Sequence, residues 1–204
     1  SKTVQSSSSS NEDEVVSQSG TKNSNNSKNS KSFEFINDLP AKPSQVYGES
    51  GAGLGQFVDP CGVLLDLPTN VTYVTEYGNH RIQKFDPSTG KFEIVQLRDK
   101  EGRAIKLDYP ACICRQASSG HVIVADSGNN CVRVFNRDWT QVSVIESLHE
   151  PFGVGTLGTD RVLVSELASH KVRIFDLNEL KCIRAISGPS RTPLKAPNSV
   201  ISNG

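Results

Sequence analysis

The sequence has no methionine, one tryptophan and no apolar run of about 18 residues, the minimum for a membrane-spanning helix. It also has no excess of charge, because 22 basic and 22 acidic side chains give a formal net charge of zero. The bulk positive charge that marks many nucleic-acid-binding domains is therefore absent. Any recognition of RNA would have to depend on a few groups gathered on one face.

Paired cysteine spacings are missing as well. The odd number of cysteines argues against a disulfide framework and favours a reducing compartment, so we expect a cytoplasmic location. Cys112 and Cys114 lie in an apolar, strand-like run rather than in the turn that a zinc knuckle needs, and we expect neither a metal nor another cofactor. The five cysteines are Cys61, Cys112, Cys114, Cys131 and Cys182.

The composition changes along the chain. Residues 1–32 are rich in Ser and Asn and poor in large apolar side chains, which predicts a disordered linker. Residues 33–46 form a transitional segment that Pro40 and Pro43 interrupt. From residue 47 to residue 204, runs of Val, Ile, Tyr and Phe alternate with Gly, Asn and Asp, and no helical period is visible. This pattern predicts an all-β domain of short strands and close turns.

Self-similarity is the strongest signal in this domain. The stretch NVTYVTEYGNHRIQKFD (70–86) recurs as GHVIVADSGNNCVRVFN (120–136) and as DRVLVSELASHKVRIFD (160–176). A Pro-containing strand precedes each copy and one more β-prone run follows it, so each repeat has four strands, named a to d in chain order. The spacing predicts repeats at about 47–96, 97–146 and 147–186, with the start of a fourth at 187–204, as in propellers and other repeat folds.

These residues resemble the NHL repeat. The first copy reads GLGQFVDPCGV and then YVTEYGNHRIQKFD, which includes the Asn79-His80 pair and the apolar Ile82 of the family pattern. The chain looks most like the C-terminal domain of the tripartite-motif NHL proteins. The resemblance implies an all-β propeller of four-stranded blades, here a fragment with about three blades plus one strand of an expected six.

Several residues of the repeat have expected structural roles. We expect Gly78 and Gly128 to take the positive φ of a tight turn. The aligned acids Glu76, Asp126 and Glu166 are expected to pair with strand c or to cap the turn. Gly residues allow close approach at the centre of the propeller, where Cys112 departs from the pattern and would crowd its neighbours.

In a four-stranded antiparallel blade the b–c and d–a loops emerge on one face. We assign binding to this face, including the whole 97–109 loop, because its loops are the longer and more varied ones. Tyr77 would stack on a base, while Arg81, Lys171 and Asn130 would contact phosphates or base edges. His80 recurs in the repeat, which favours a turn role. The candidate residues are Tyr77, His80, Arg81, Arg98, Lys100, Arg103, Asn130 and Lys171.

The resemblance implies a scaffold that binds single-stranded or stem-loop RNA, or a protein, in post-transcriptional repression or in recruitment for ubiquitination. It implies no catalytic residue in this chain, no small-molecule substrate and no membrane partner; a RING upstream would carry any ligase activity. Two alternatives remain. One is a zinc enzyme similar to the peptidyl-hydroxyglycine lyases, although none of the four histidines maps to strand a. The other is a structural secreted propeller, which the unpaired cysteines disfavour.

Overall fold

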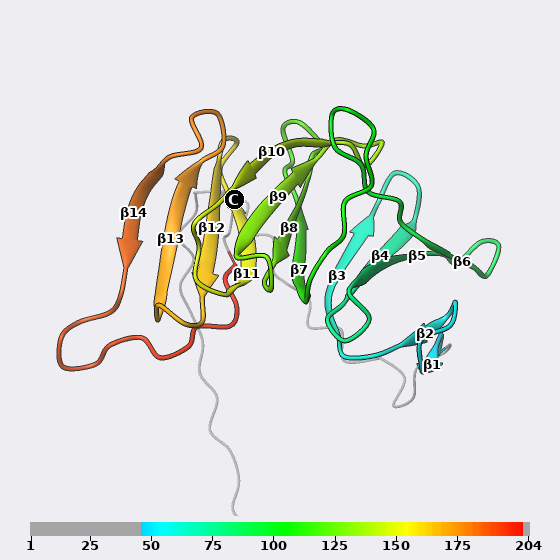
Figure 1. Ribbon diagram of the computed structural model, residues 1–204, viewed down its shortest axis with the longest axis horizontal. Coiled ribbons are helices and arrows are strands. Elements are labelled where there is room, and N and C mark those ends of the chain that lie inside the picture. The colour runs from blue at the N-terminus through cyan, green and yellow to red at the C-terminus, as the bar shows by residue number, and fades with distance from the viewer. Residues whose placement is uncertain (1–45, 202–204) are drawn as a thin grey trace, which may run out of the picture. The chain divides into compact units, whose positions relative to one another are not determined.

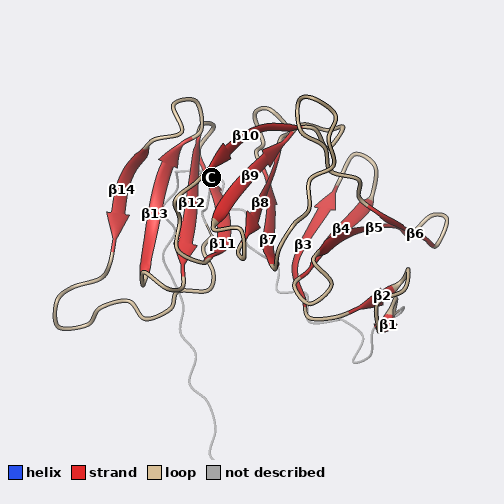
Figure 2. Cartoon of the chain, viewed as in Figure 1, coloured by secondary structure: helices blue, strands red, loops and turns tan. Residues whose placement is uncertain are grey.

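The computed structural model describes residues 46–201. The predicted linker 1–32 and the transitional segment up to residue 45 lie outside this range, as do residues 202–204. The described part of the chain contains strands, turns and loops without a helix, and its main strands form three four-stranded antiparallel sheets (Figures 1 and 2). The predicted all-β propeller architecture is confirmed.

Each sheet is a simple up-and-down meander and forms one blade. A short parallel pair, β1 (Glu49–Ser50) and β2 (Gln56–Phe57), precedes the blades. Blade 1 contains β3 (Pro60–Asp66), β4 (Val71–Glu76), β5 (Arg81–Asp86) and β6 (Lys91–Ile94). Blade 2 contains β7 (Pro110–Arg115), β8 (Val122–Asp126), β9 (Cys131–Phe135) and β10 (Gln141–Ile145). Blade 3 contains β11 (Pro151–Leu157), β12 (Arg161–Glu166), β13 (Lys171–Asp176) and β14 (Cys182–Ile186).

Apolar side chains of strands b and c fill the spaces between blades, as expected. Strand β8 is buried along its whole length because it faces a neighbouring blade on both sides. Val122 and Val124 pack with Ile82 of blade 1, whereas Ile123 and Ala125 pack in a second cluster with residues of blade 3. Since side chains alternate along a strand, one continuous apolar run supplies both cores.

The innermost strands lie side by side, with β7 in contact with both β3 and β11 (Figure 1). Gly62 is required here: an added Cβ would lie 2.8 Å from the hydroxyl of Thr75 and 2.9 Å from the Cα of Cys112. Cys112 does not crowd blade 2 as predicted, because its partner in the register is the small Ala125, where blade 1 has Thr75.

After β14 the chain returns to the inner edge of blade 3. A Cβ added to Gly153 would lie 2.9 Å from the Cα of Ser199, just as one on Gly62 would lie 2.9 Å from the Cα of Cys112. The segment around Ser199 thus stands beside β11 as β7 stands beside β3. It has the position of an innermost strand, although no strand is formed there.

Candidate binding face

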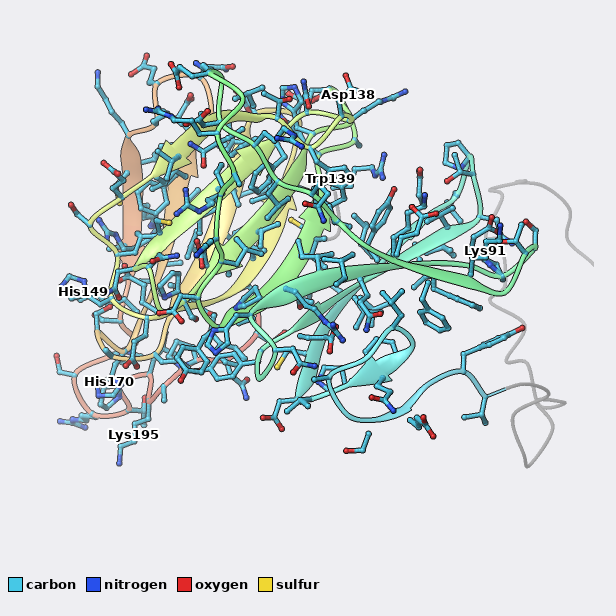
Figure 3. The ribbon with its side chains drawn as sticks, turned by 45° about the vertical axis from the view of Figure 1, so that its right-hand side comes forward. Lys91, Asp138, Trp139, His149, His170 and Lys195 are labelled. Carbon is cyan, nitrogen blue, oxygen red and sulfur yellow. The ribbon has the colours of Figure 1, made fainter. Side chains whose placement is uncertain are left out.

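The b–c turns and the d–a loops are joined at one end of the blades, as blade geometry requires. In each blade a side chain of the b–c turn accepts a hydrogen bond from a backbone N–H of the following d–a loop. The Tyr109 N–H donates to Nδ1 of His80 at 3.1 Å, and the Glu150 N–H donates to Oδ1 of Asn130 at 3.0 Å. The Ala196 N–H donates to Nδ1 of His170 at 3.1 Å. Figure 3 shows His149, His170 and Lys195 gathered at this end, with Asp138 and Trp139 at the other. The recurring His and Asn side chains therefore tie each blade to the next, the turn role expected for His80.

The positive φ of the b–c turn falls at a different residue from the one predicted. It belongs to His80, Asn130 and His170, at 54°, 52° and 55°, and not to Gly78 or Gly128. Asn and His tolerate this conformation better than most residues. The two glycines are needed for space, because an added Cβ would overlap the side chain of Val58 or of Asp108.

The aligned acids form a buried network under the face, as predicted. Glu76 and Asp126 are fully buried and Glu166 is 1 % exposed. Arg133 Nε lies 2.6 Å from the carboxylate of Asp126, and Arg173 Nη1 lies 2.8 Å from that of Glu166. The turn residue three positions after each acid also donates to it, from Asn79, Asn129 or Ser169. This column is structural.

Arg81 is part of the same network. Its Nε lies 2.6 Å from Glu76, and its terminal nitrogens donate to the carbonyls of Ala52, Gly53 and Gln56. In blades 2 and 3 the arginine stands two residues later in strand c, where blade 1 has Gln83. The Arg81 guanidinium is thus engaged by these contacts, and its side chain is 13 % exposed.

The basic loop does not lie where the sequence predicted. The N–H of Arg98 donates to the carbonyl of Trp139 at 3.1 Å, and Gln141 donates back to Arg98 at 2.8 Å. These contacts place residue 98 beside the c–d turn of blade 2, at the opposite end from the b–c turns. The assignment of the whole 97–109 loop to the binding face is therefore wrong for this part.

The physical reason is the anchoring of the loop by its apolar residues. Leu97, Ile105 and Leu107 pack into the core between blades 1 and 2, which directs the intervening hairpin over the outer edge of blade 2. Lys100 lies exposed in this hairpin. Arg103 is 74 % exposed, but it is ion-paired with Asp99 at 2.5 Å and with Glu101 at 2.9 Å. The hairpin therefore carries little uncompensated positive charge.

The face brings together four rings from three blades, which we call the aromatic patch: Tyr77, His80, Tyr109 and Phe152. The Tyr77 ring lies 4.8 Å from that of Tyr109 and 6.0 Å from that of Phe152, and Tyr109 lies 4.4 Å from His80. Tyr109 is 41 % exposed. Lys171 is exposed at the start of β13, on the same face but outside this group of rings.

Sequence reasoning found Tyr77 but missed Tyr109 and Phe152. Both flank the Pro that opens strand a, in the aligned segments DPCG, YPAC, EPFG and APNS. The residue before this Pro has a positive φ in every copy, 47° at Asp59, 48° at Tyr109, 51° at Glu150 and 40° at Ala196. The position before this Pro therefore has the same backbone conformation in every blade but a different side chain, and this variation is the feature that points to Tyr109.

Acidic groups surround the patch. Burial raises the pKa of the Tyr77 phenol, and the charges of Glu150 and Asp108 raise it further. The Asp108 carboxylate lies 2.9 Å from Nδ1 of His80 and is 45 % exposed. The charged groups that act on the Tyr77 ring are therefore acidic.

Comparison with protein families agrees with this geometry. The NHL repeat family matches residues 107–135, which contain the d–a contact, β7, β8 and β9. This segment is similar to the NHL repeat. The chain is also similar to the Protein brain tumor of Drosophila melanogaster, with 32% identity over 135 residues that cover 65% of this chain and 13% of that protein.

Two further relatives are similar over a comparable length. The B-box type zinc finger protein ncl-1 of Caenorhabditis elegans is 26% identical over 64% of this chain and 15% of its own length. The E3 ubiquitin-protein ligase NHLRC1 of Homo sapiens is 25% identical over 62% of this chain and 31% of its own length. The predicted likeness to the tripartite-motif NHL proteins is confirmed, and the chain spans less than a third of each relative.

Solved structures with the same fold are more distant. A chain of the nidogen/laminin complex matches with a TM-score of 0.56 and 20% identity, over 71% of this chain and 54% of that one. The virginiamycin B lyase from Staphylococcus aureus matches with a TM-score of 0.54 and 19% identity, over 71% of this chain and 46% of that one. At this identity the matches show the fold alone.

Within residues 46–201 no three His, Cys, Asp or Glu side chains are close enough together to hold a metal ion. His80 and His170 accept backbone N–H groups in separate blades, and His149 lies 3.9 Å from Glu166. The same range contains no helix that is long and apolar enough to cross a membrane.

Proposed function

We propose that this chain is a macromolecule-binding scaffold of the tripartite-motif NHL type, which recognises RNA or protein through the b–c and d–a face. The observation that carries the proposal is the aromatic patch. Three blades contribute rings to one exposed group, and Tyr109 leaves 41 % of its surface in solvent. Exposed aromatic clusters of this kind are typical of recognition surfaces.

The patch is not a requirement of the repeat. The positions of Tyr109 and Phe152 are occupied in blade 1 by Asp59 and Cys61, although the proline of strand a pairs with the buried acid in the same way in all three blades. The buried acids, in contrast, recur in every blade. Because side chains that vary between repeats do not maintain the fold, binding is the better explanation for them.

We further propose that the chain acts without catalysis of its own, in repression or in recruitment of substrates for ubiquitination. The relatives include a protein named as a ubiquitin ligase, of which this chain covers 31%. Any such activity would belong to other parts of a longer protein. The proposed division is a linker at 1–32, a transitional segment at 33–46 and the propeller from 47. All five cysteines are free, which supports a cytoplasmic location.

The test is binding by the whole chain and by two variants. Tyr77→Ala removes a ring from the patch, and Arg137→Ala changes an exposed side chain at the opposite end of blade 2. The chains would be immobilised and exposed to a random-sequence RNA pool and, separately, to a displayed peptide library. We expect enrichment from at least one pool with the unchanged chain and with Arg137→Ala, and a loss of enrichment with Tyr77→Ala. Equal enrichment by all three chains would place binding elsewhere.

A further inference from the structure

We propose that the aromatic patch binds an arginine or lysine side chain of a partner protein, held over the rings of Tyr77 and Tyr109 and neutralised by the carboxylates around them. This inference rests on the proposed function and specifies its ligand. It departs from the expectation that Tyr77 stacks on a base of RNA.

The rings have a geometry suited to a cation. The planes of Tyr77 and Tyr109 are tilted by 39°, those of Tyr77 and Phe152 by 46°, and those of His80 and Tyr109 by 59°. Tyr109 is 41 % exposed, so part of its surface stays open to a ligand. A guanidinium or ammonium group over such a face is attracted by the ring quadrupole, most strongly where water is excluded.

The charges around the rings have the sign that this ligand needs. Asp59 and Glu150 are exposed and occupy the same pre-proline position as Tyr109, in the blades on either side of it. Within residues 46–201 neither carboxylate has a hydrogen-bond or ion-pair partner. Asp108, directly before Tyr109, adds a third carboxylate that is 45 % exposed. Besides burial, the charges of Glu150 and Asp108 raise the pKa of Tyr77, which agrees with the nearness of these two carboxylates to the rings.

The arginines of the candidate set do not lie among the rings. Arg81 is held by Glu76, and Arg98 and Arg103 lie at the outer edge of blade 2. Lys195 occupies the d–a position of the next repeat, beside His170 (Figure 3). A stacked base would bring its phosphates among the carboxylates of Asp59, Asp108 and Glu150, and Arg81, Arg98 and Arg103 are not placed to offset them. A cationic side chain meets no such penalty, and it gains both ring and carboxylate contacts.

The experiment uses the whole chain labelled with 3-fluorotyrosine, which reports on its four tyrosines separately by fluorine NMR. The probes are acetyl-Gly-Arg-Gly-amide, the same peptide with uncharged citrulline, and an octamer of uridine RNA at low salt. We expect the arginine peptide to shift the Tyr77 and Tyr109 signals. Tyr73, which packs against Trp139 between blades 1 and 2, should not move. The citrulline peptide and the RNA should leave all four signals in place.

Variants separate the two contributions. Tyr109→Gly removes a ring at a backbone position that glycine adopts without strain, and Glu150→Gln removes one charge. Each should weaken binding of the arginine peptide by about threefold or more. Glu179→Gln is the matched control, because Glu179 is an exposed acid in a c–d turn. It should leave the affinity unchanged.

The outcomes distinguish this inference from the proposed function. If RNA shifts Tyr77 and Tyr109 and the arginine peptide does not, the ligand assignment is wrong while the face still binds. If neither probe moves these signals and Tyr77→Ala still enriches the same RNA and peptides as the unchanged chain, both proposals fail. Equal shifts by the arginine and citrulline peptides would show that charge is not recognised, which also overturns the inference.

Discussion

The buried layer and the exposed layer of the binding face differ in how their residues vary from blade to blade. Just below the surface, Glu76, Asp126 and Glu166 recur in all three blades, and each meets an arginine. At the surface, the pre-proline position keeps its backbone but presents a different side chain in every copy. The buried layer is under the constraint of folding, because an unpaired carboxylate there is costly. Side chains in the exposed layer are not constrained by folding in this way. We therefore expect the positions that differ between blades to determine which ligand is bound.

In the buried layer, the arginine that pairs with the acid comes from different positions of strand c in different blades. In blade 1 the arginine comes from the first residue of strand c, Arg81, and Gln83 donates to the same acid at 2.8 Å. In blades 2 and 3 it comes from the third residue, Arg133 or Arg173. Two positions on one side of strand c can therefore supply the guanidinium, since side chains two apart face the same way.

The comparison predicts its largest effect at Arg133. Arg133→Met leaves Asp126 fully buried without its cation, and we expect a loss of about 3–5 kcal/mol in the free energy of unfolding, measured by urea denaturation. Arg103→Met is the control, because that arginine is 74 % exposed and its pairs should contribute under about 1 kcal/mol. Similar losses in the two variants would mean that the buried ion pairs contribute no more to stability than the exposed ones.

A smaller loss is expected at the innermost strands. Gly62→Ala would place a Cβ within 2.9 Å of main-chain atoms of the neighbouring blade, and we expect a cost of about 1–3 kcal/mol in thermal or urea unfolding. Gly53→Ala is matched, because its Cβ would meet chiefly the flexible end of Gln56. The prediction fails if both substitutions are tolerated equally.

The exposed layer should respond in the opposite way. Tyr109→Gly removes a surface ring from a residue with a φ of 48°, so relief of backbone strain offsets the lost ring contacts. We expect the free energy of unfolding to change by less than about 1 kcal/mol while binding of the arginine peptide weakens by about threefold or more. A drop comparable to that of Arg133→Met would show that the two layers are not independent.

Cysteine reactivity gives the smallest and most local test. Burial raises the pKa of the Cys131 thiol to about 12, and burial likewise raises that of Cys114. At pH 8 the thiolate of Cys131 is populated on the order of 10⁻⁴, so an aromatic disulfide reagent should label the exposed Cys182 well before Cys131. The pKa of the Cys131 thiol is higher in the folded state than in the unfolded state. The free energy of unfolding should therefore fall as the pH rises above the ordinary thiol range.

Mass spectrometry would follow this labelling site by site. Loss of Arg133 also removes a charge that lowers the pKa of Cys131, so any faster labelling in Arg133→Met must come from more frequent opening of the destabilised blade. We expect this opening to dominate in Arg133→Met, whereas Tyr109→Gly should leave the labelling of Cys131 unchanged. Rapid labelling of Cys131 in the unchanged chain would contradict its burial.

The sequence was sufficient for the parts of the structure that depend on short-range pattern. Alternating apolar residues and three aligned copies predicted the blades, and the acidic column predicted its own pairing with strand c. The position of residues 98–103 was not predictable in this way, because it depends on where Leu97 and Leu107 find a core between two blades. Tyr109 and Phe152 were missed because their proximity to Tyr77 arises only when three blades are placed side by side.

The residue before each strand-a proline has a consequence for how such a protein can change over evolutionary time. At Tyr109, Glu150 and Ala196 the amide is fixed by the preceding blade, whatever side chain the residue carries. A single amino-acid replacement at this position would change the side chain that one blade exposes. The backbone of that blade and the neighbouring blades would stay unchanged. New partners can then be acquired in independent steps, one blade at a time, without passing through an unfolded intermediate.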